Sequence, residues 1–351
     1  MLAWSAGAAC LPHARAGDLA WAIDRPAIPV RHPDKAVLLG AALCGDTVLV
    51  VGERGVIVLS MDLGRTWHQA AQVPTSTTLT AVQCQGASGA LAVGHGAVVL
   101  ATSDGGEHWS RQIDGRKVAQ QRLAGAQARQ PEDAKDLADA QRWVTEGPDK
   151  PLLDVVVGAG GSALAVGAYN LILESVDGGK NWRSIAERLD NPKQLHLHVV
   201  ARHGDVVVIA GEQGLIFRSE DGGKHFMRLN SPYSGSWYAL ALLDDKTMIL
   251  GGLRGQAWWT RDAGANWLPV KGLPPVSVVS ARVIEKETVM LQNQIGQLFR
   301  TSLDGTLVVP LGPPNSAPSN GMLPLPGGNV LALTVQGIGR VSAQVDKKEH
   351  P

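Results

Sequence analysis

The chain has 351 residues, of which 44% are hydrophobic and 41 are glycines, and its 32 Lys and Arg residues balance its 32 Asp and Glu residues. Because balanced charges create no long-range field, we expect no nucleic acid and no anionic membrane surface as a partner. The sequence contains no apolar run long enough to cross a bilayer, so we do not expect the protein itself to be transmembrane.

Residues 1–16 are predicted to be a signal peptide. Leu2 to Leu11 is largely apolar, and Ala14-Arg15-Ala16 offers small residues at a cleavage site. A basic segment would normally precede the apolar stretch, and its absence here indicates a truncated leader or a mis-assigned start. We therefore expect an exported protein, which in a bacterium would be periplasmic.

A block of the form Ser/Thr-x-Asp-x-Gly-x-x-aromatic recurs along the chain, first at residues 60–67. Successive aspartates lie 42, 73, 44, 41 and 42 residues apart, and such a fixed period indicates a repeat architecture. Each block follows a short apolar run, which predicts a strand followed by a tight turn. The aspartates and aromatic residues are Asp62 and Trp67, Asp104 and Trp109, Asp177 and Trp182, Asp221 and Phe226, Asp262 and Trp267, and Asp304 in a degenerate copy.

A second signature, a glycine-rich turn ahead of each apolar run, occurs seven times. It begins at Gly52 in the first copy and at Thr334 in the last. Seven units of about 42 residues, each a small antiparallel sheet, predict an all-β seven-bladed β-propeller over residues 17–345. The segment Leu19 to Ile23 resembles the strand that follows each aspartate block, so we predict that an N-terminal strand completes the last blade. Residues 346–351 are expected to be a disordered tail.

The long interval between Asp104 and Asp177 contains an insertion at residues 114–150, between blades two and three. It lacks strand alternation, and we predict two helices, about 117–129 and 132–144, separated at Pro131. Its first half is basic and its second half is acidic. A helical pair that satisfies its own charges is therefore an alternative to a binding element.

Three cysteines are present, and removal of the leader would take Cys10 away. Cys44 and Cys84 would remain in the first two blades, where a disulfide is possible in an oxidising compartment. Two buried free thiols are an equally good interpretation, since spacing alone does not bring two Cα atoms within bonding range.

The aspartate block resembles the Asp-box (BNR) repeat of sialidases. Together with the glycine-rich turn, the pattern resembles more closely the photosystem II stability/assembly factor-like propellers, which have bacterial relatives outside photosynthesis. The resemblance covers residues 18–342 apart from the insertion. It implies a non-enzymatic scaffold that binds a membrane-protein complex and aids its assembly, stability or operation: a photosystem II-like complex, or an envelope exporter in a non-photosynthetic bacterium.

The glycine-rich turns and the blade-to-blade connections are expected at one end of the propeller, which we call the channel face. Loops on a rigid scaffold are the usual home of binding residues. The candidate partner-binding residues on this face are Glu53, Arg54, His95, Tyr169, Glu212, Gln213, Arg254, Gln294 and Gln336. The candidates in the insertion are Arg116, Lys117, Arg122 and Arg129.

The rival interpretation is a glycan-binding propeller or a sialidase-like glycoside hydrolase. Such a site needs an arginine cluster and a tyrosine with a carboxylate neighbour, and the chain has three tyrosines without a recognisable cluster. His196 and His198 share one face of a strand but lack a third metal ligand. We therefore expect a monomer with no catalytic residues, no metal and no cofactor.

Overall fold

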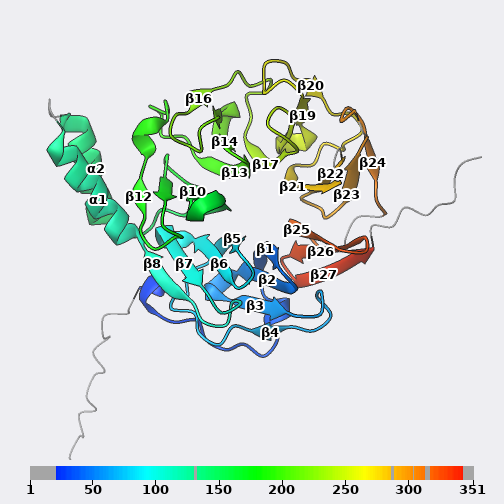
Figure 1. Ribbon diagram of the computed structural model, residues 1–351, viewed down its shortest axis with the longest axis horizontal. Helices are drawn as coiled ribbons and strands as arrows, with labels where there is room; N and C mark the ends of the chain where they lie inside the picture. The colour runs from blue at the N-terminus through cyan, green and yellow to red at the C-terminus, as the bar shows by residue number, and fades with distance from the viewer. Residues whose placement is uncertain (1–20, 130–132, 286–287, 303, 313–316, 343–351) are drawn as a thin grey trace, which may run out of the picture.

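The computed structural model describes residues 21–129, 133–285, 288–302, 304–312 and 317–342. Seven antiparallel sheets surround a central axis, so the predicted seven-bladed propeller is confirmed (Figure 1). The innermost strands are β1 (Leu38–Cys44), β5 (Leu79–Gln85), β9 (Leu152–Val157), β13 (Leu197–His203), β17 (Trp237–Leu242), β21 (Val278–Glu285) and β25 (Ser319–Leu325).

Each blade continues outward in sequence order. The second strands are β2 (Thr47–Gly52), β6 (Gly89–Gly94), β10 (Ala163–Gly167), β14 (Val206–Gly211), β18 (Met248–Gly252), β22 (Thr288–Asn293) and β26 (Asn329–Thr334). The third strands are β3 (Ile57–Ser60), β7 (Val98–Thr102), β11 (Ile172–Ser175), β15 (Ile216–Ser219), β19 (Ala257–Thr260), β23 (Leu298–Thr301) and β27 (Gly337–Ser342). The short outer strands are β4 (His68–Gln69), β8 (Ser110–Ile113), β12 (Arg183–Ser184), β16 (Met227–Arg228), β20 (Leu268–Pro269) and β24 (Val308–Pro310).

The Asp-box turns are closed by their own side chains. In the first copy, Ser60 Oγ donates to Asp62 Oδ1 over 2.7 Å and accepts from the N–H of Gly64, also over 2.7 Å. The carboxylate of Asp62 then accepts from the N–H groups of Arg65 and Thr66. These local bonds hold the turn in shape, which explains why the same residue types recur. In other copies the turn also bonds within its blade, as Gly105 N–H does to the Ser88 carbonyl oxygen.

Each Asp-box turn also touches the preceding blade. A Cβ added to Gly106, whose φ is +104°, would lie 2.5 Å from a methyl carbon of Leu49 in blade one. The indole N–H of Trp109 donates to the Gly106 carbonyl oxygen over 2.7 Å and holds the ring against this turn. The repeat therefore specifies contacts between blades as well as the turn itself.

The lowered pKa values of the Asp-box carboxylates lead us to expect that the stability of the fold decreases in acid. The N–H and side-chain amide of Asn181, with Ser175 and Lys180, lower the pKa of Asp177 to about 2 from its usual 3.8. The native state thus binds fewer protons than the unfolded chain between these values, so stability present above about pH 4 is lost as the pH falls toward 2. Thermal melts should show this loss, and the Asp177→Asn variant should lose less over the same range. Parallel pH profiles would contradict the assignment.

The described N-terminal residues do not supply the predicted closing strand. Blade seven has three strands, and Ala22–Asp24 forms a 3-10 turn instead. Residues beyond it run along the outside of blade one, where Ala27 N–H donates to Val73 and Val30 N–H to the side chain of Gln69. Pro26, Pro29 and Pro33 follow the predicted strand, and because they lack N–H groups this following segment does not pair as a ladder strand.

The ring is closed by side-chain packing between blades seven and one. Leu38 and Val58 of blade one share a buried cluster with Leu331 and Leu333 of blade seven. The side-chain amide of Asn320 donates to the Leu38 carbonyl oxygen over 3.0 Å. No described strand is exchanged across this seam.

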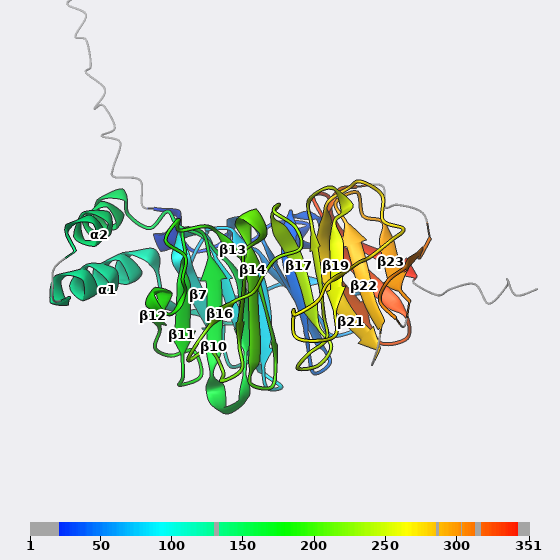
Figure 2. The ribbon, with the colours of Figure 1, turned by 90° about the horizontal axis from the view of Figure 1, so that it is seen from above.

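The insertion forms two helices, as predicted, α1 (Gly115–Ala128) and α2 (Ala134–Glu146). Asp114 and Asp133 cap their N-termini by accepting backbone N–H groups, which sets each start within two residues of the predicted position. Pro131 lies outside the described residues. The helices project from the edge of the propeller beside blades two and three (Figures 1 and 2). Within the described residues, no helix has the length and apolar character needed to span a membrane.

A disulfide joins Cys44 at the end of β1 to Cys84 in β5, with Cα atoms 5.3 Å apart. In this structure the two cysteines are therefore bridged and are not free thiols. The bond links the innermost strands of blades one and two, next to the channel.

Candidate functional site: the channel face and the central cavity

The seven glycine-rich turns lie at one end of the propeller, above the points where the chain enters the innermost strands. The first residue of each turn donates its backbone N–H to a carbonyl oxygen of the segment that leads into the innermost strand. Glu53 donates in this way to the Val37 carbonyl oxygen and Glu212 to the His196 carbonyl oxygen. The central residue is left-handed in several turns, with φ of +54° for Arg54, +56° for Tyr169 and +54° for Arg254. This conformation directs those side chains away from the blade, and all three are exposed.

The predicted channel-face residues divide into two groups. Glu53 and Glu212 are half-buried because their carboxylates accept the N–H groups of Val37 and His196 over 3.0 and 3.1 Å. Their first role is to position the chain that enters each blade. The others are exposed to solvent and available for contact: Arg54, His95, Tyr169, Gln213, Arg254, Gln294 and Gln336.

The basic residues of the insertion are largely engaged. Arg116 forms ion pairs of 2.7 Å with both Asp24 and Asp114, and Arg129 lies 3.0 Å from Asp136. The guanidinium of Arg122 stacks 4.5 Å above the ring of Trp143. Lys117 is exposed on α1. Arg122 and Arg129 thus pair within the hairpin, as the self-paired alternative expects, whereas Arg116 also pairs outside it, with Asp24. Lys117 remains a predicted contact residue.

A row of aromatic rings leads from the insertion to the channel. Lys150 Nζ lies 5.3 Å from the centre of the Trp143 ring and 5.8 Å from that of Tyr169. Tyr169 packs edge-on against His196 at 4.7 Å, and His198 stacks on Tyr238 at 4.9 Å. The two histidine rings are 6.3 Å apart, which completes the row. Tyr169 and Tyr238 remain 46% and 37% exposed, so the row presents ring faces to a ligand.

Among these rings, only Tyr169 was a predicted partner-binding residue, and His196 and His198 were considered only as a possible metal pair. Every innermost strand carries a register shift after its first residue, as between Leu197 and Val199. The residue left unpaired at this shift is His198 in blade four and Tyr238 in blade five. The two rings therefore meet because they occupy equivalent positions in neighbouring blades. Aligning the seven repeats by register would have identified this pair, whereas spacing within one strand suggested a metal pair.

His198 is set up as a neutral hydrogen-bonding group. Burial lowers its pKa, with a smaller opposing effect from the Trp237 carbonyl. Nδ1 lies 2.9 Å from that carbonyl oxygen and must carry the proton because a carbonyl only accepts, which leaves Nε2 as an acceptor. Among the described residues, no three His, Cys, Asp or Glu side chains are grouped to hold a metal ion.

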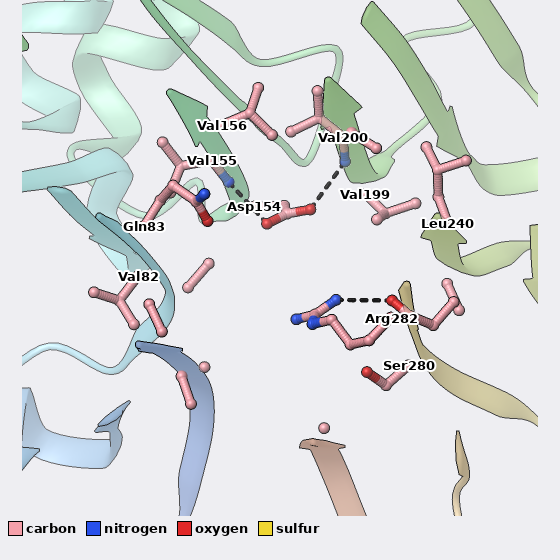
Figure 3. A pocket seen from close by; sticks show the side chains of 18 of the residues that line it. Val82, Gln83, Asp154, Val155, Val156, Val199, Val200, Leu240, Ser280 and Arg282 are labelled. Carbon is pink, nitrogen blue, oxygen red and sulfur yellow. Dashed lines mark hydrogen bonds between the residues drawn. The ribbon is translucent and has the colours of Figure 1, made fainter. Parts of the chain in front are cut away.

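A cavity of about 570 Å³ occupies the channel and is lined by the innermost strands of all seven blades. Asp154 of β9 and Arg282 of β21 both reach into it (Figure 3). Within the described part of the chain, its lining contains one tyrosine, Tyr238, two arginines and no glutamate. A sialidase-type arrangement of three arginines beside a tyrosine and a carboxylate is therefore not assembled by these residues.

Comparison with known proteins supports the predicted resemblance. Residues 137–274 match the family described as photosynthesis system II assembly factor YCF48. No curated protein matches the sequence. Two structures of YCF48 have the same fold. YCF48 bound to D1 peptide is 18% identical with a TM-score of 0.63, covering 90% of this chain and 97% of its own. YCF48 from Cyanidioschyzon merolae is 17% identical with a TM-score of 0.61, covering 88% of this chain and 96% of its own.

The same fold also occurs in an enzyme. Virginiamycin B lyase from Staphylococcus aureus is 11% identical with a TM-score of 0.66, covering 88% of this chain and 94% of its own. Identities this low establish the architecture alone, so activity has to be argued from the site. The chain is thus a seven-bladed β-propeller that resembles the photosystem II assembly factor YCF48, in sequence over residues 137–274 and in fold over most of its length.

Proposed function

We propose that this protein is an exported, non-enzymatic scaffold that binds a segment of a membrane-protein complex on its channel face and aids the assembly, stability or operation of that complex. The observation that carries the proposal is the aromatic row from Trp143 to Tyr238, which joins the insertion to the channel. Rigid, half-exposed aromatic rings flanked by cations are typical anchors for peptide segments.

Two further observations support this proposal. A propeller of the same fold, YCF48, is known in complex with D1 peptide. The disulfide between Cys44 and Cys84 is of a kind that persists in oxidising compartments, which favours a periplasmic or lumenal location. The partner could be a photosystem II-like complex or, in a non-photosynthetic bacterium, an envelope exporter.

Charge reversal on the channel face tests the proposal. The bait carries residues 17–351 and is used for affinity capture from membranes of the source organism. The Arg54→Asp, Arg254→Asp double variant should retain the partner at least tenfold less well, because rim charges steer association. Asp is chosen because it tolerates the left-handed backbone at both positions.

Arg65→Asp is the matched control, since Arg65 is exposed on the opposite, Asp-box face. It should capture the partner as well as the wild type, and all three proteins should melt at the same temperature. A bait lacking residues 116–146 then asks whether the insertion contributes. Equal capture by the double variant and the wild type would defeat the assignment of the face. Absence of any protein partner, together with binding on a glycan array, would favour the carbohydrate-binding alternative.

A further inference from the structure

The repeat register shows that two charged residues of the channel are exceptions at their positions. Asp154 pairs with Val166 immediately after the register shift of β9. The residues at the same register position in the other six blades are small or apolar, and they are Gly40, Ala81, Val199, Ala239, Ser280 and Gly321. Small side chains at this level open the cavity, and one blade places a carboxylate in it.

Arg282 is the corresponding exception two residues further along the strand. Its counterparts include Ala42, Ala201 and Ala241. Asp154 belongs to blade three and Arg282 to blade six, which is the largest separation that a ring of seven blades permits. The two charges face each other across the open channel (Figure 3). Because their blades are not neighbours, an ion pair between adjacent blades does not explain their presence.

The two charges are only partly satisfied by the protein. Both carboxylate oxygens of Asp154 accept a backbone N–H, from Val155 and Val200, each over 2.9 Å. Arg282 donates from Nη1 to the Ala281 carbonyl oxygen over 3.0 Å. The two side chains interact electrostatically, and among the described residues no ion pair joins them. A guanidinium has five N–H donors, so most of this donor capacity is open to the cavity.

The two charges differ in their exposure, since Asp154 is half-buried and Arg282 is exposed to the channel. Burial raises the pKa of Asp154 to about 6, and the N–H of Val200 and the charge of Arg282 counteract that rise. The other charged group in the lining, Arg202, is already occupied by the Gly204 carbonyl, the Ser162 hydroxyl and Asp205. The cavity thus holds one unmatched negative and one unmatched positive charge on opposite walls.

We propose that the channel binds a small zwitterion, an amino acid or short peptide, whose ammonium group pairs with Asp154 and whose carboxylate pairs with Arg282. The cavity volume of about 570 Å³ falls within the range of small-molecule pockets. Gln83 reaches into the same space from β5 and offers both a donor and an acceptor (Figure 3).

Ligands with one charge fit this cavity less well. A simple anion would satisfy Arg282 and leave Asp154 unpaired and repelled, and a simple cation would do the reverse. A zwitterion satisfies both walls and brings no net charge into a partly desolvated site. The cavity shares His198 and Tyr238 with the aromatic row, but Asp154 and Arg282 are not among the residues assigned to partner binding, so variants of these two test the zwitterion site separately.

The test is a length series of zwitterions titrated into the full chain. Glycine, β-alanine, 4-aminobutyrate, 6-aminohexanoate and dialanine are compared with hexanoate and hexylamine by ligand-observed NMR and calorimetry. At least one zwitterion should bind tenfold or more tightly than either singly charged compound, and the preferred length reports the gap between the two walls.

Variants then assign the binding. Arg282→Gln and Asp154→Asn should each weaken the preferred zwitterion at least tenfold. Arg65→Gln on the Asp-box face should leave it unchanged. If Asp154→Asn melts at a lower temperature because its backbone hydrogen bonds are disturbed, the two Arg282 variants still test the proposal. Arg282→Lys keeps the positive charge and should bind the zwitterion more tightly than Arg282→Gln. Failure of every zwitterion to bind, equal binding by a singly charged compound, or unchanged binding in Arg282→Gln would each overturn the proposal.

Discussion

Replacing Cys44 and Cys84 together by alanine is expected to lower the free energy of unfolding by about 4 kcal/mol. The bond closes a loop with a sequence separation of 40 residues, and its loss gives the unfolded chain that much more freedom. It also unties the innermost strands of the first two blades, where both sulfur atoms lie in or beside a buried cluster. Denaturant melts of the variant and the wild type measure the difference.

A reductant provides the control for this measurement. Reduced wild-type protein should melt like the double variant, and the variant itself should be indifferent to reductant. Identical denaturation midpoints for oxidised wild type and variant would show that the packing of β1 against β5 suffices without the bond.

The second large effect is expected from Trp143→Ala, which should release the helical hairpin from the propeller. Trp143 is 6% exposed, belongs to the buried cluster of blades two and three, and lies beneath Arg122 and beside Lys150. Truncating a buried tryptophan costs about 3 to 5 kcal/mol of stability. In this protein the loss should weaken the packing of α1 and α2 against the propeller. It also removes the first ring of the aromatic row.

Hydrogen exchange distinguishes local release from general unfolding. In Trp143→Ala the amides of α1 and α2 should exchange faster while those of the strands stay protected, and capture of the partner should fall. Val144→Ala is the matched control, because Val144 is the next residue and is 43% exposed. Unchanged exchange in the helices would mean that other contacts, such as Arg116 with Asp24, hold the hairpin in place.

The repeat was readable from sequence because its determinants are local. Ser60, Asp62 and Gly64 make their turn within five residues, so the pattern survives in each copy and gives the number of blades. The helix starts were predictable for the same reason, since Asp114 and Asp133 cap their own helices.

Features that depend on distant residues were harder to predict. The N-terminal segment resembles a strand in composition, but its prolines and its contacts with Val73 and Gln69 place it outside the sheets. Asp154 and Arg282 are 128 residues apart, counted from 154 to 282, and look unremarkable in their own strands. Only the register of all seven blades shows that they share a channel.

The seam between blades seven and one determines how this ring can open. Because no described strand crosses it, the described part of blade seven can separate from blade one without unthreading a strand. Opening then disrupts one interface, held by apolar side chains and the bond from Asn320 to Leu38, whereas any other break must also stretch a covalent connection between blades. Fraying, insertion of an additional blade by duplication, and exchange of blade seven between molecules should all begin at this seam.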